Sequence, residues 1–385
     1  MLNFEFHNPT RIVFGQGKVA DLARLVPAQA RVLVLYGGES ARRTGTLDEV
    51  RAALGERSVS EFGGIEPNPS YETLMRAVEQ VRAEHIDYLL AVGGGSVIDG
   101  TKFVAAAACF DGEPWDILLQ RGRNVQRALP LASVLTLPAT GSEMNNGGVV
   151  TRKATQAKLS FSSVHCFPQF SVLDPTKTYT LPPAQIANGL VDAYVHVMEQ
   201  YLTYPVQARP QDRFAEGLLQ TLVEIAPGAL AEPPDYDHRA NLMWTATLAL
   251  NGLIGAGVPQ DWATHMIGHE LTALYGIDQA RTLAIVLPSL MQSQRVAKRD
   301  KLLQYAERVW HVSGGTEDER IDAAITHTRA FFESVGIPTR LSAYGLGREA
   351  VDAVVAQLTA HGMLNLGEHR SITPEVSRAI MEAAL

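Results

Sequence analysis

The first half of the chain alternates short, uninterrupted apolar runs with longer amphipathic stretches. Residues 31–36 (RVLVLY) and 88–92 (YLLAV) are typical of strands that are buried on both faces. Between them apolar residues recur at helical spacing, and Asn68-Pro69 has the composition of a helix start, which predicts a helix to about Glu84. We expect another helix at about 97–109 and further strands at 134–137 and 171–173. Strands that alternate with helices predict a parallel sheet with helices on both faces.

The pattern changes after Leu181-Pro182-Pro183, where the strand-like runs stop and long helical periodicities begin. We therefore predict two domains, an α/β domain over residues 1–180 and an all-helical domain over residues 181–385. Amphipathic helices are expected in the second domain at about 185–202, 211–225, 239–253, 260–275, 300–312, 319–335 and 348–361.

Composition and charge narrow the class of protein. The 385 residues carry 41 acidic and 33 basic side chains, a net charge of −8, and no cluster of Lys and Arg that would bind nucleic acid or an anionic membrane. The N-terminus contains Glu5 and lacks the apolar core of a secretory signal, and the most apolar stretch, 88–110, is interrupted by glycines and charges. Two cysteines, Cys109 and Cys166, make no disulfide framework. We expect a cytoplasmic protein with no nucleic-acid or membrane partner.

A glycine-rich segment, Gly93-Gly94-Gly95-Ser96, lies where a predicted strand ends and a predicted helix begins. Glycines let the backbone approach a pyrophosphate closely, and the N–H groups of a helix N-terminus stabilise its charge. Asp99 and Lys102 follow one turn into the helix and strengthen this interpretation. A plain turn between a strand and a helix explains the glycines equally well.

A second glycine pair, Gly37-Gly38, follows the first predicted strand, with Ser40, Arg42 and Arg43 close behind. Small and basic residues at this place in a dinucleotide fold admit a 2′-phosphate, which favours NADP over NAD. Glu39 opposes this preference if its carboxylate points into the site, and has no effect if it faces water. No segment matches the G-x-G-x-x-G fingerprint.

Two helices of the predicted second domain each offer a pair of side chains four residues apart: Asp192 with His196, and His265 with His269. Such pairs share one face of a helix, and two of them can together enclose a divalent cation. The second pair is not a zincin motif, because Glu270 follows the second histidine instead of preceding it. The alternative is that these histidines only pack in the interior.

Taken together, these motifs resemble the iron-containing (group III) alcohol dehydrogenases. The similarity runs the full length of the chain and is closest to the butanol-dehydrogenase-like subgroup, which contains bacterial broad-specificity NADPH-dependent aldehyde reductases. It is carried by the segments 14–17 (FGQG), 63–69 (GGIEPNP), 93–102 (GGGS-x₂-D-x₂-K), 136–143 (TLPATGSE), 173–175 (LDP), 192–196 (D-x₃-H) and 258–269 (VPQDWATHMIGH).

The resemblance implies a dehydroquinate synthase-like fold: an N-terminal α/β dinucleotide-binding domain, an all-α C-terminal domain, and an active cleft between them. It implies NADP(H) and a divalent metal, zinc or iron, as cofactors, small aliphatic aldehydes and alcohols as substrates, and a homodimer. By motif position, three metal ligands would be Asp192, His196 and His265. The cofactor-binding residues would be Gly37, Gly38, Ser40, Asn68, Gly94, Gly95, Ser96, Asp99, Thr136, Thr140, Lys158 and Tyr179.

The fourth metal ligand is where this chain departs from the family. The family pattern places a histidine fourteen positions after His265, and this chain has Gln279 there. A neutral amide oxygen is a poorer ligand than imidazole for Zn²⁺ or Fe²⁺. Three outcomes follow: Gln279 binds the metal weakly, His269 or Asp278 replaces the missing ligand, or the position is empty or filled by water.

The expected reaction is metal-dependent hydride transfer between NADPH and a small aldehyde, with the cation stabilising the developing alkoxide. His269 is the candidate for transferring the proton, and a purely structural role beside His265 is its alternative. Trp262 and Tyr275 either line an apolar pocket or pack in the core. Two other functions are a metal-independent reductase on the same fold and, because of Gln279, a catalytically silent dinucleotide-binding protein.

Overall fold

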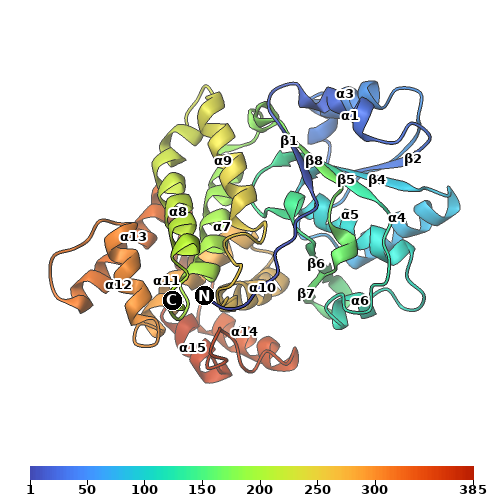
Figure 1. The fold of residues 1–385 in the computed structure, drawn as a ribbon. Helices are drawn as coiled ribbons and strands as arrows, with labels where there is room; N and C mark the ends of the chain where they lie inside the picture. Colours follow the sequence, from blue (N-terminus) through green and yellow to red (C-terminus); the bar gives the residue numbers. More distant parts are fainter. The chain divides into compact units, whose positions relative to one another are not determined.

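The computed structural model describes residues 1–385 and divides into two compact units (Figure 1). The sheet unit comprises His7–Pro182 together with Pro234–Thr247, and the helical unit comprises Met1–Phe6, Pro183–Pro233 and Leu248–Leu385. The changeover at Pro182-Pro183 lies beside the boundary expected from the sequence. The addition of Pro234–Thr247 to the sheet unit was not expected, and the two-domain division stays a prediction.

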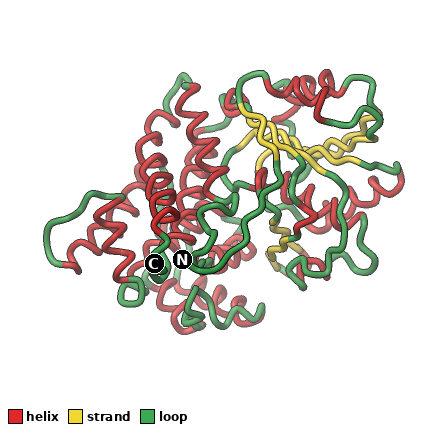
Figure 2. Tube along the Cα trace, viewed as in Figure 1, coloured by secondary structure: helices red, strands yellow, loops and turns green.

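The sheet unit is built on six parallel strands in the order β1-β8-β5-β4-β2-β3, drawn in yellow in Figure 2. The sheet consists of β1 (Arg11–Phe14), β2 (Arg31–Tyr36), β3 (Ser58–Phe62), β4 (Tyr88–Gly94), β5 (Leu131–Leu137) and β8 (Phe170–Leu173). A separate antiparallel pair consists of β6 (Gly147–Arg152) and β7 (Ala157–Ser162). The parallel sheet predicted from the apolar runs is therefore confirmed.

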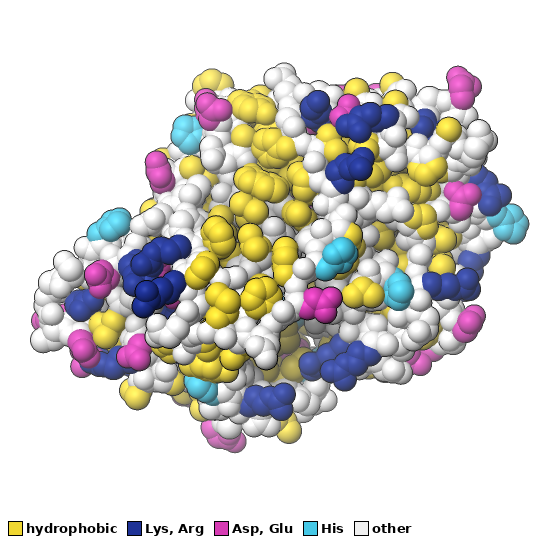
Figure 3. All heavy atoms as spheres, in the orientation of Figure 1, with side chains coloured by type: hydrophobic (Ala, Val, Ile, Leu, Met, Phe, Trp, Pro, Cys, Tyr) yellow, Lys and Arg dark blue, Asp and Glu magenta, His cyan; other side chains and the backbone are white.

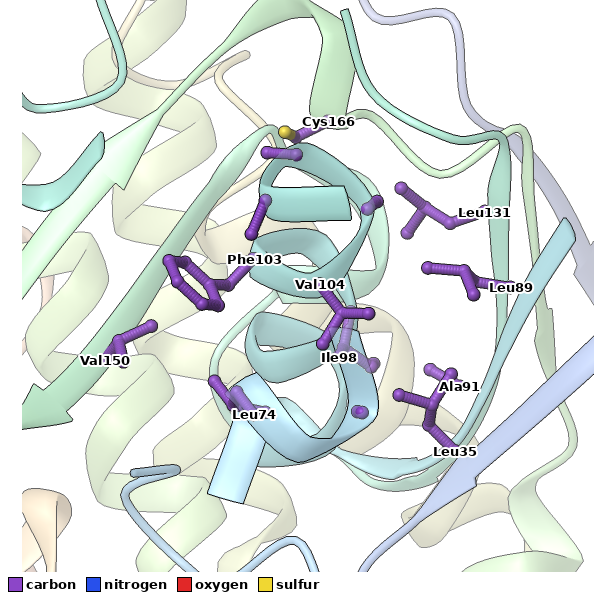
Figure 4. Close-up of a cluster of buried hydrophobic side chains, with 14 of the residues drawn as sticks. Leu35, Leu74, Leu89, Ala91, Ile98, Phe103, Val104, Leu131, Val150 and Cys166 are labelled. Carbon is purple, nitrogen blue, oxygen red and sulfur yellow. The ribbon is translucent and has the colours of Figure 1, made fainter. Parts of the chain in front are cut away.

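Helices cover both faces of the sheet, α1 and α3 on one face and α4 and α5 on the other (Figure 1). The helices of this unit are α1 (Leu22–Leu25), α2 (Ser40–Arg43), α3 (Thr46–Leu54), α4 (Tyr71–Ala83), α5 (Gly95–Ala108), α6 (Asp116–Leu119) and most of α9 (Tyr236–Ala249). Because side chains of a strand alternate between its faces, Leu35 and Ala91 pack against Ile98 and Val104 of α5 (Figure 4). Val34 and the residues two positions away on the same strand point to the opposite face of the sheet, where they form a second cluster with α1 and α3.

The helical unit has no strand and buries its own core among packed helices. Its helices are α7 (Pro183–Tyr201), α8 (Arg209–Ala229), α10 (Ala263–Tyr275), α11 (Gln279–Ser293), α12 (Arg299–Arg308), α13 (Glu317–Ser334), α14 (Arg348–Ala360) and α15 (Pro374–Glu382). One cluster joins Ile267 and Leu271 of α10 to Ile285 of α11, Val354 of α14 and Ile380 of α15. The fold class expected from the sequence, an α/β region followed by an all-helical region, is confirmed.

One local prediction was wrong, and one long helix was missed. The helix predicted from Asn68 begins only at Tyr71, because Ser70 is the N-cap and its hydroxyl accepts a hydrogen bond from the Thr73 N–H. Asn68 instead has a left-handed backbone, with φ of 55°. The 15-residue helix α11 was not predicted, since Pro288 lies inside it and a proline in a helical pattern indicates a break. Short 3₁₀ segments occur at Lys18–Asp21, Ser142–Met144, Lys153–Thr155, Val164–Cys166, Pro175–Thr178 and Leu341–Tyr344.

The surface combines basic, acidic and hydrophobic side chains. On the face drawn in Figure 3, Lys and Arg side chains form small separate groups among acidic and hydrophobic ones. None of the helices combines the length and the apolar composition that crossing a membrane requires.

Candidate functional site

Three potential metal ligands of the helical unit lie close together. Asp192 and His196 are one turn apart on α7, and His265 lies in the first turn of α10. Their ligand atoms all lie within 4.8 Å of one another, and the three side chains are buried. The imidazole rings of His196 and His265 are stacked, with their centroids 4.7 Å apart. One carboxylate and two imidazoles form a donor set that suits a divalent zinc or iron ion.

Glu199, one turn beyond His196 on α7, orients His265. Its Oε1 accepts hydrogen bonds from the backbone N–H of His265 at 3.0 Å and from Nδ1 of the ring at 2.9 Å, and its Oε2 accepts from the Trp262 N–H at 3.0 Å. A proton on Nδ1 places the ring lone pair on Nε2, which is the atom left to bind a cation. Burial and the nearby Asp261 carboxylate raise the pKa of Glu199, and the backbone N–H groups of His265 and Trp262 lower it.

A buried ion cluster in turn fixes the start of α10. The Lys298 ammonium donates to Asp261 Oδ2 at 2.7 Å, to both oxygens of Glu368 at 2.8 Å, and to the Leu202 carbonyl at 2.8 Å. The Asp261 N–H donates to the Glu199 carbonyl, and Asp261 Oδ1 accepts from the Ala263 N–H at the first residue of α10. The cluster therefore links the end of α7 to the beginning of α10 and sets the spacing between their metal ligands.

Glu199, Asp261 and Lys298 were missed by the sequence analysis. A signal for Glu199 was present, because a carboxylate inside the apolar run 189–202 must have buried partners. Asp261 and Lys298 gave no local signal, since the contacts that define them come from distant parts of the chain.

Gln279 lies at the first residue of α11, next to the candidate metal ligands. Its Nε2 donates to Asp192 Oδ1 at 3.0 Å. The neighbouring Asp278 accepts a hydrogen bond at 3.0 Å from Asn188 Nδ2, one turn before Asp192 on α7. Two amide–carboxylate pairs therefore run in opposite directions between α7 and the start of α11. Asp278 does not join the group of close ligand atoms.

His269 lies one turn after His265 and is buried, with the two ring centroids 6.3 Å apart. It is not part of the close ligand group, and its proton-transfer role stays a prediction. Trp262 is the N-cap of α10 with φ of 65°, and its ring lies 5.1 Å from that of His265. Tyr275, at the end of α10, is 37% exposed, so the alternative that it packs in the core is wrong.

In the sheet unit, β4 ends at Gly94 and α5 begins at Gly95, so the glycine segment forms a strand-to-helix junction as expected. A Cβ on Gly95 would overlap the Thr140 side chain, and one on Gly93 would lie 2.6 Å from Val97 Cγ2. Close packing alone therefore requires these glycines. The first turn of α5, where Gly95 is buried and Ser96 half-buried, still carries backbone N–H groups of the kind that bind phosphate.

Three predicted cofactor residues meet beside this junction. Ser96 Oγ accepts a hydrogen bond from the Asn68 N–H at 3.3 Å, and Lys158 Nζ donates to Asn68 Oδ1 at 2.8 Å. The left-handed backbone of Asn68 thus has a structural consequence, because it brings this residue between α5 and β7. Thr136, Thr140 and Tyr179 are half-buried: Thr136 lies near the carboxyl end of β5, and the other two lie in loops after strands.

Asp99 and Lys102 support the loop that follows β5. The Asp99 carboxylate accepts from Ser142 Oγ at 2.6 Å and from the Val149 N–H at 2.9 Å. Lys102 donates to the same Ser142, to Asn145 and to the Gly147 carbonyl, and burial lowers the pKa of its ammonium to about 8. Both side chains are engaged within the protein, so a contact between Asp99 and the cofactor stays a prediction.

The second glycine pair follows β2 and precedes α2. Gly38 has open space at its Cβ position, whereas a Cβ on Gly37 would lie 3.2 Å from the Ile65 carbonyl oxygen. Arg42 donates to the Tyr36 hydroxyl and lies 3.7 Å from the Glu39 carboxylate, whose side chain is 72% exposed. The Glu39 side chain therefore faces water beside Arg42.

Two signatures of one enzyme family together match most of the chain. The signature "Iron-containing alcohol dehydrogenase" matches residues 9–175, and "Fe-containing alcohol dehydrogenase family, C-terminal" matches residues 186–385. The chain is 60% identical to the NADPH-dependent aldehyde reductase YqhD of Escherichia coli, and 40% identical to the probable NADH-dependent butanol dehydrogenase 1 of Bacillus subtilis, each over the full length of both chains.

Solved structures agree with the sequence matches. A crystal structure of Escherichia coli YqhD superposes with a TM-score of 0.99 at 60% identity, covering 100% of this chain and 99% of that one. The NADH-dependent butanol dehydrogenase A of Thermotoga maritima superposes with a TM-score of 0.95 at 34% identity, with the same coverage. The family resemblance expected from the motifs is confirmed, and the chain belongs to the iron-containing alcohol dehydrogenase family.

Proposed function

We propose that the chain is a metal-dependent NADP(H) alcohol dehydrogenase, or aldehyde reductase, that transfers hydride between NADPH and small aliphatic aldehydes. The observation that carries the proposal is the buried group of Asp192, His196 and His265, with ligand atoms within 4.8 Å of one another. The NADPH-dependent aldehyde reductase of Escherichia coli, which is 60% identical over its full length, supports the cofactor and the substrate class.

The residues present suit a divalent cation. His265 Nδ1 lies 2.9 Å from Glu199 Oε1, and a proton on Nδ1 would leave Nε2 with the lone pair that a metal requires. When bound, a zinc or iron ion at Asp192, His196 and His265 would supply Lewis-acid polarisation of the substrate carbonyl. In this proposal Glu199 fixes the orientation of His265, and His269 delivers the proton that the reduced oxygen needs.

The cofactor is assigned to the sheet unit. NADPH would supply the hydride, while the backbone of Gly94, Gly95 and Ser96 at the start of α5 would hold its pyrophosphate. Gly37, Gly38 and Ser40 would surround the 2′-phosphate, and Glu39 beside them is exposed and pairs with Arg42 at 3.7 Å. The remaining assignments, which line the ribose and nicotinamide, are Asn68, Asp99, Thr136, Thr140, Lys158 and Tyr179.

We also propose a homodimer in the cytoplasm. The dimer follows from the family resemblance, and light scattering of the purified protein tests it. The two cysteines, Cys109 and Cys166, are unpaired, which suits a reducing compartment.

The decisive experiment follows NADPH oxidation with butanal, using metal-stripped protein and protein resupplied with Zn²⁺ or Fe²⁺. We expect activity only after metal is returned. Full activity of the stripped protein would instead indicate a metal-independent reductase. NADPH binding without turnover of any aldehyde, under either condition, would indicate a catalytically silent dinucleotide-binding protein.

A further inference from the structure

Gln279 touches the candidate metal centre through a hydrogen-bond donor. The atom 3.0 Å from Asp192 Oδ1 is Nε2, the amide nitrogen of Gln279. An amide nitrogen that carries two hydrogens has no lone pair to offer a cation. Through Nε2, Gln279 therefore binds the carboxylate of a neighbouring ligand, and this atom adds no ligand to the cation.

The surrounding geometry explains why the amide is turned this way. Asn188 and Asp192 lie one turn apart on α7, while Asp278 and Gln279 are adjacent at the start of α11. Each helix supplies one amide and one carboxylate, and each amide donates to the carboxylate of the other helix at 3.0 Å. Reversing the Gln279 amide would direct its oxygen at the Asp192 carboxylate, which accepts hydrogen bonds and repels a second acceptor.

From this arrangement we infer that Gln279 is a positioning residue, and that the centre has three protein ligands and an open coordination position. The inference rests on the proposed function only in assuming that Asp192, His196 and His265 bind a divalent cation. Gln279 fixes the rotation of the Asp192 carboxylate, as hydrogen-bonding partners of metal ligands commonly do. The open position accepts a small exogenous nitrogen ligand, for which imidazole is the probe.

The test uses the full-length protein loaded with Co²⁺, whose visible absorption changes with its ligands. Imidazole is titrated into the wild type, Gln279→Leu and Gln279→His, and the Co²⁺ Kd of each is measured by competition with a chelator. We expect the wild type to bind imidazole, and Gln279→Leu to bind it with an affinity within about twofold while holding Co²⁺ about 10-fold more weakly. Gln279→His supplies a fourth protein ligand, so it should hold Co²⁺ at least about 10-fold more tightly and lose imidazole binding.

Two results with the Gln279 variants would overturn the inference. If imidazole binds Gln279→Leu but not the wild type, the amide itself occupies the fourth position. If neither substitution changes the Co²⁺ Kd, Gln279 does not act on the centre. Thermal unfolding of the metal-free variants identifies any that fail to fold.

Asn188→Leu is the matched control, since it removes the companion pair and leaves the contact between Gln279 and Asp192. We expect its Co²⁺ Kd to stay within about threefold of the wild type, well short of the change expected for Gln279→Leu. An equal loss in both variants would mean that helix packing, and not Asp192, explains the effect, which also contradicts the inference. Neither NADPH nor aldehyde is needed, so a failure of the proposed function shows up separately, as absent turnover by a protein that binds metal.

Discussion

The glycine segment of the sheet unit and the metal centre of the helical unit are built in opposite ways. The three glycines Gly93–Gly95 are contiguous in sequence, and their requirement is the absence of side chains, because a Cβ on Gly95 would overlap Thr140. The metal centre requires particular side chains from two helices, and these are held by Glu199 and by the Lys298 cluster behind it.

The two regions are sensitive to different substitutions. The segment tolerates no added volume, and the network around Asp99 and Lys102 holds the loop that packs on it. The metal centre depends on buried charges, each of which is stabilised only while its partner is present. Substitutions in the two regions should therefore have different effects. Added volume should disturb packing in the glycine segment, whereas loss of a charged partner should destabilise the metal centre.

The largest effect is expected from His265→Ala, which breaks the metal centre alone. Loss of a ligand removes the proposed electrostatic stabilisation of the reacting oxygen, so turnover of butanal should fall by about 10³-fold. NADPH binding, followed by fluorescence titration, should change by less than about twofold, because the residues assigned to the cofactor lie in the other unit. His7→Ala, an exposed histidine, is the control. Wild-type turnover by His265→Ala would contradict the metal mechanism.

The next largest effect is expected from Lys298→Met, which removes the buried cation of the cluster that fixes the start of α10. The substitution leaves the buried carboxylates of Asp261 and Glu368 without their cation, so the free energy of unfolding should fall by about 3–5 kcal/mol. Denaturant titration measures this change. Lys18→Met is the comparison, because Lys18 forms an exposed pair with Asp21 and its loss should cost less than about 1 kcal/mol. Similar losses in the two variants would show that the buried cluster adds no stability of its own.

A smaller effect is expected from Gly95→Ala in the glycine segment. The added methyl group must displace Thr140, which should lower the free energy of unfolding by about 1–3 kcal/mol. Gly217→Ala provides the contrast, since Gly217 lies inside α8 with no atom within 4 Å of its Cβ position. Alanine is the better helix former, so this variant should gain up to about 1 kcal/mol. Equal melting temperatures for both variants would count against the packing argument.

The smallest effect concerns pH and Lys102. Burial lowers the pKa of Lys102 from 10.5 to about 8, so between these values the unfolded chain keeps a proton that the folded protein has released. Stability rises with pH wherever the unfolded state binds more protons. Relative to Lys102→Met, the wild type should therefore gain about 1 kcal/mol of unfolding free energy per pH unit from pH 8 to 10. If the difference in unfolding free energy between the two proteins stays constant over this range, the pKa of Lys102 is not lowered.

The sequence predicted the structure correctly where the pattern lies within one strand or helix. Apolar runs of the RVLVLY kind predicted β2 and β4, and helical spacing predicted that Asp192 and His196 share a face of α7. The prediction failed at Asn68, where the Ser70 hydroxyl caps α4 more effectively than the Asn68-Pro69 pair. It also missed α11, because a helix with an internal proline is stabilised by its packing and has weak local preference.

By itself, then, the sequence determined the fold class through its periodicity and the family through the resemblance of its motifs. It also determined the glycine segment and the chemical types of the metal ligands, because these depend on residue order. Only the tertiary structure decided that Glu199 directs the Nε2 lone pair of His265, that Lys298 is buried between two carboxylates, and that Gln279 donates to Asp192. The physical reason is that a hydrogen bond or buried charge is defined by its partner, and each of these partners is brought close only when helices distant in the sequence pack together.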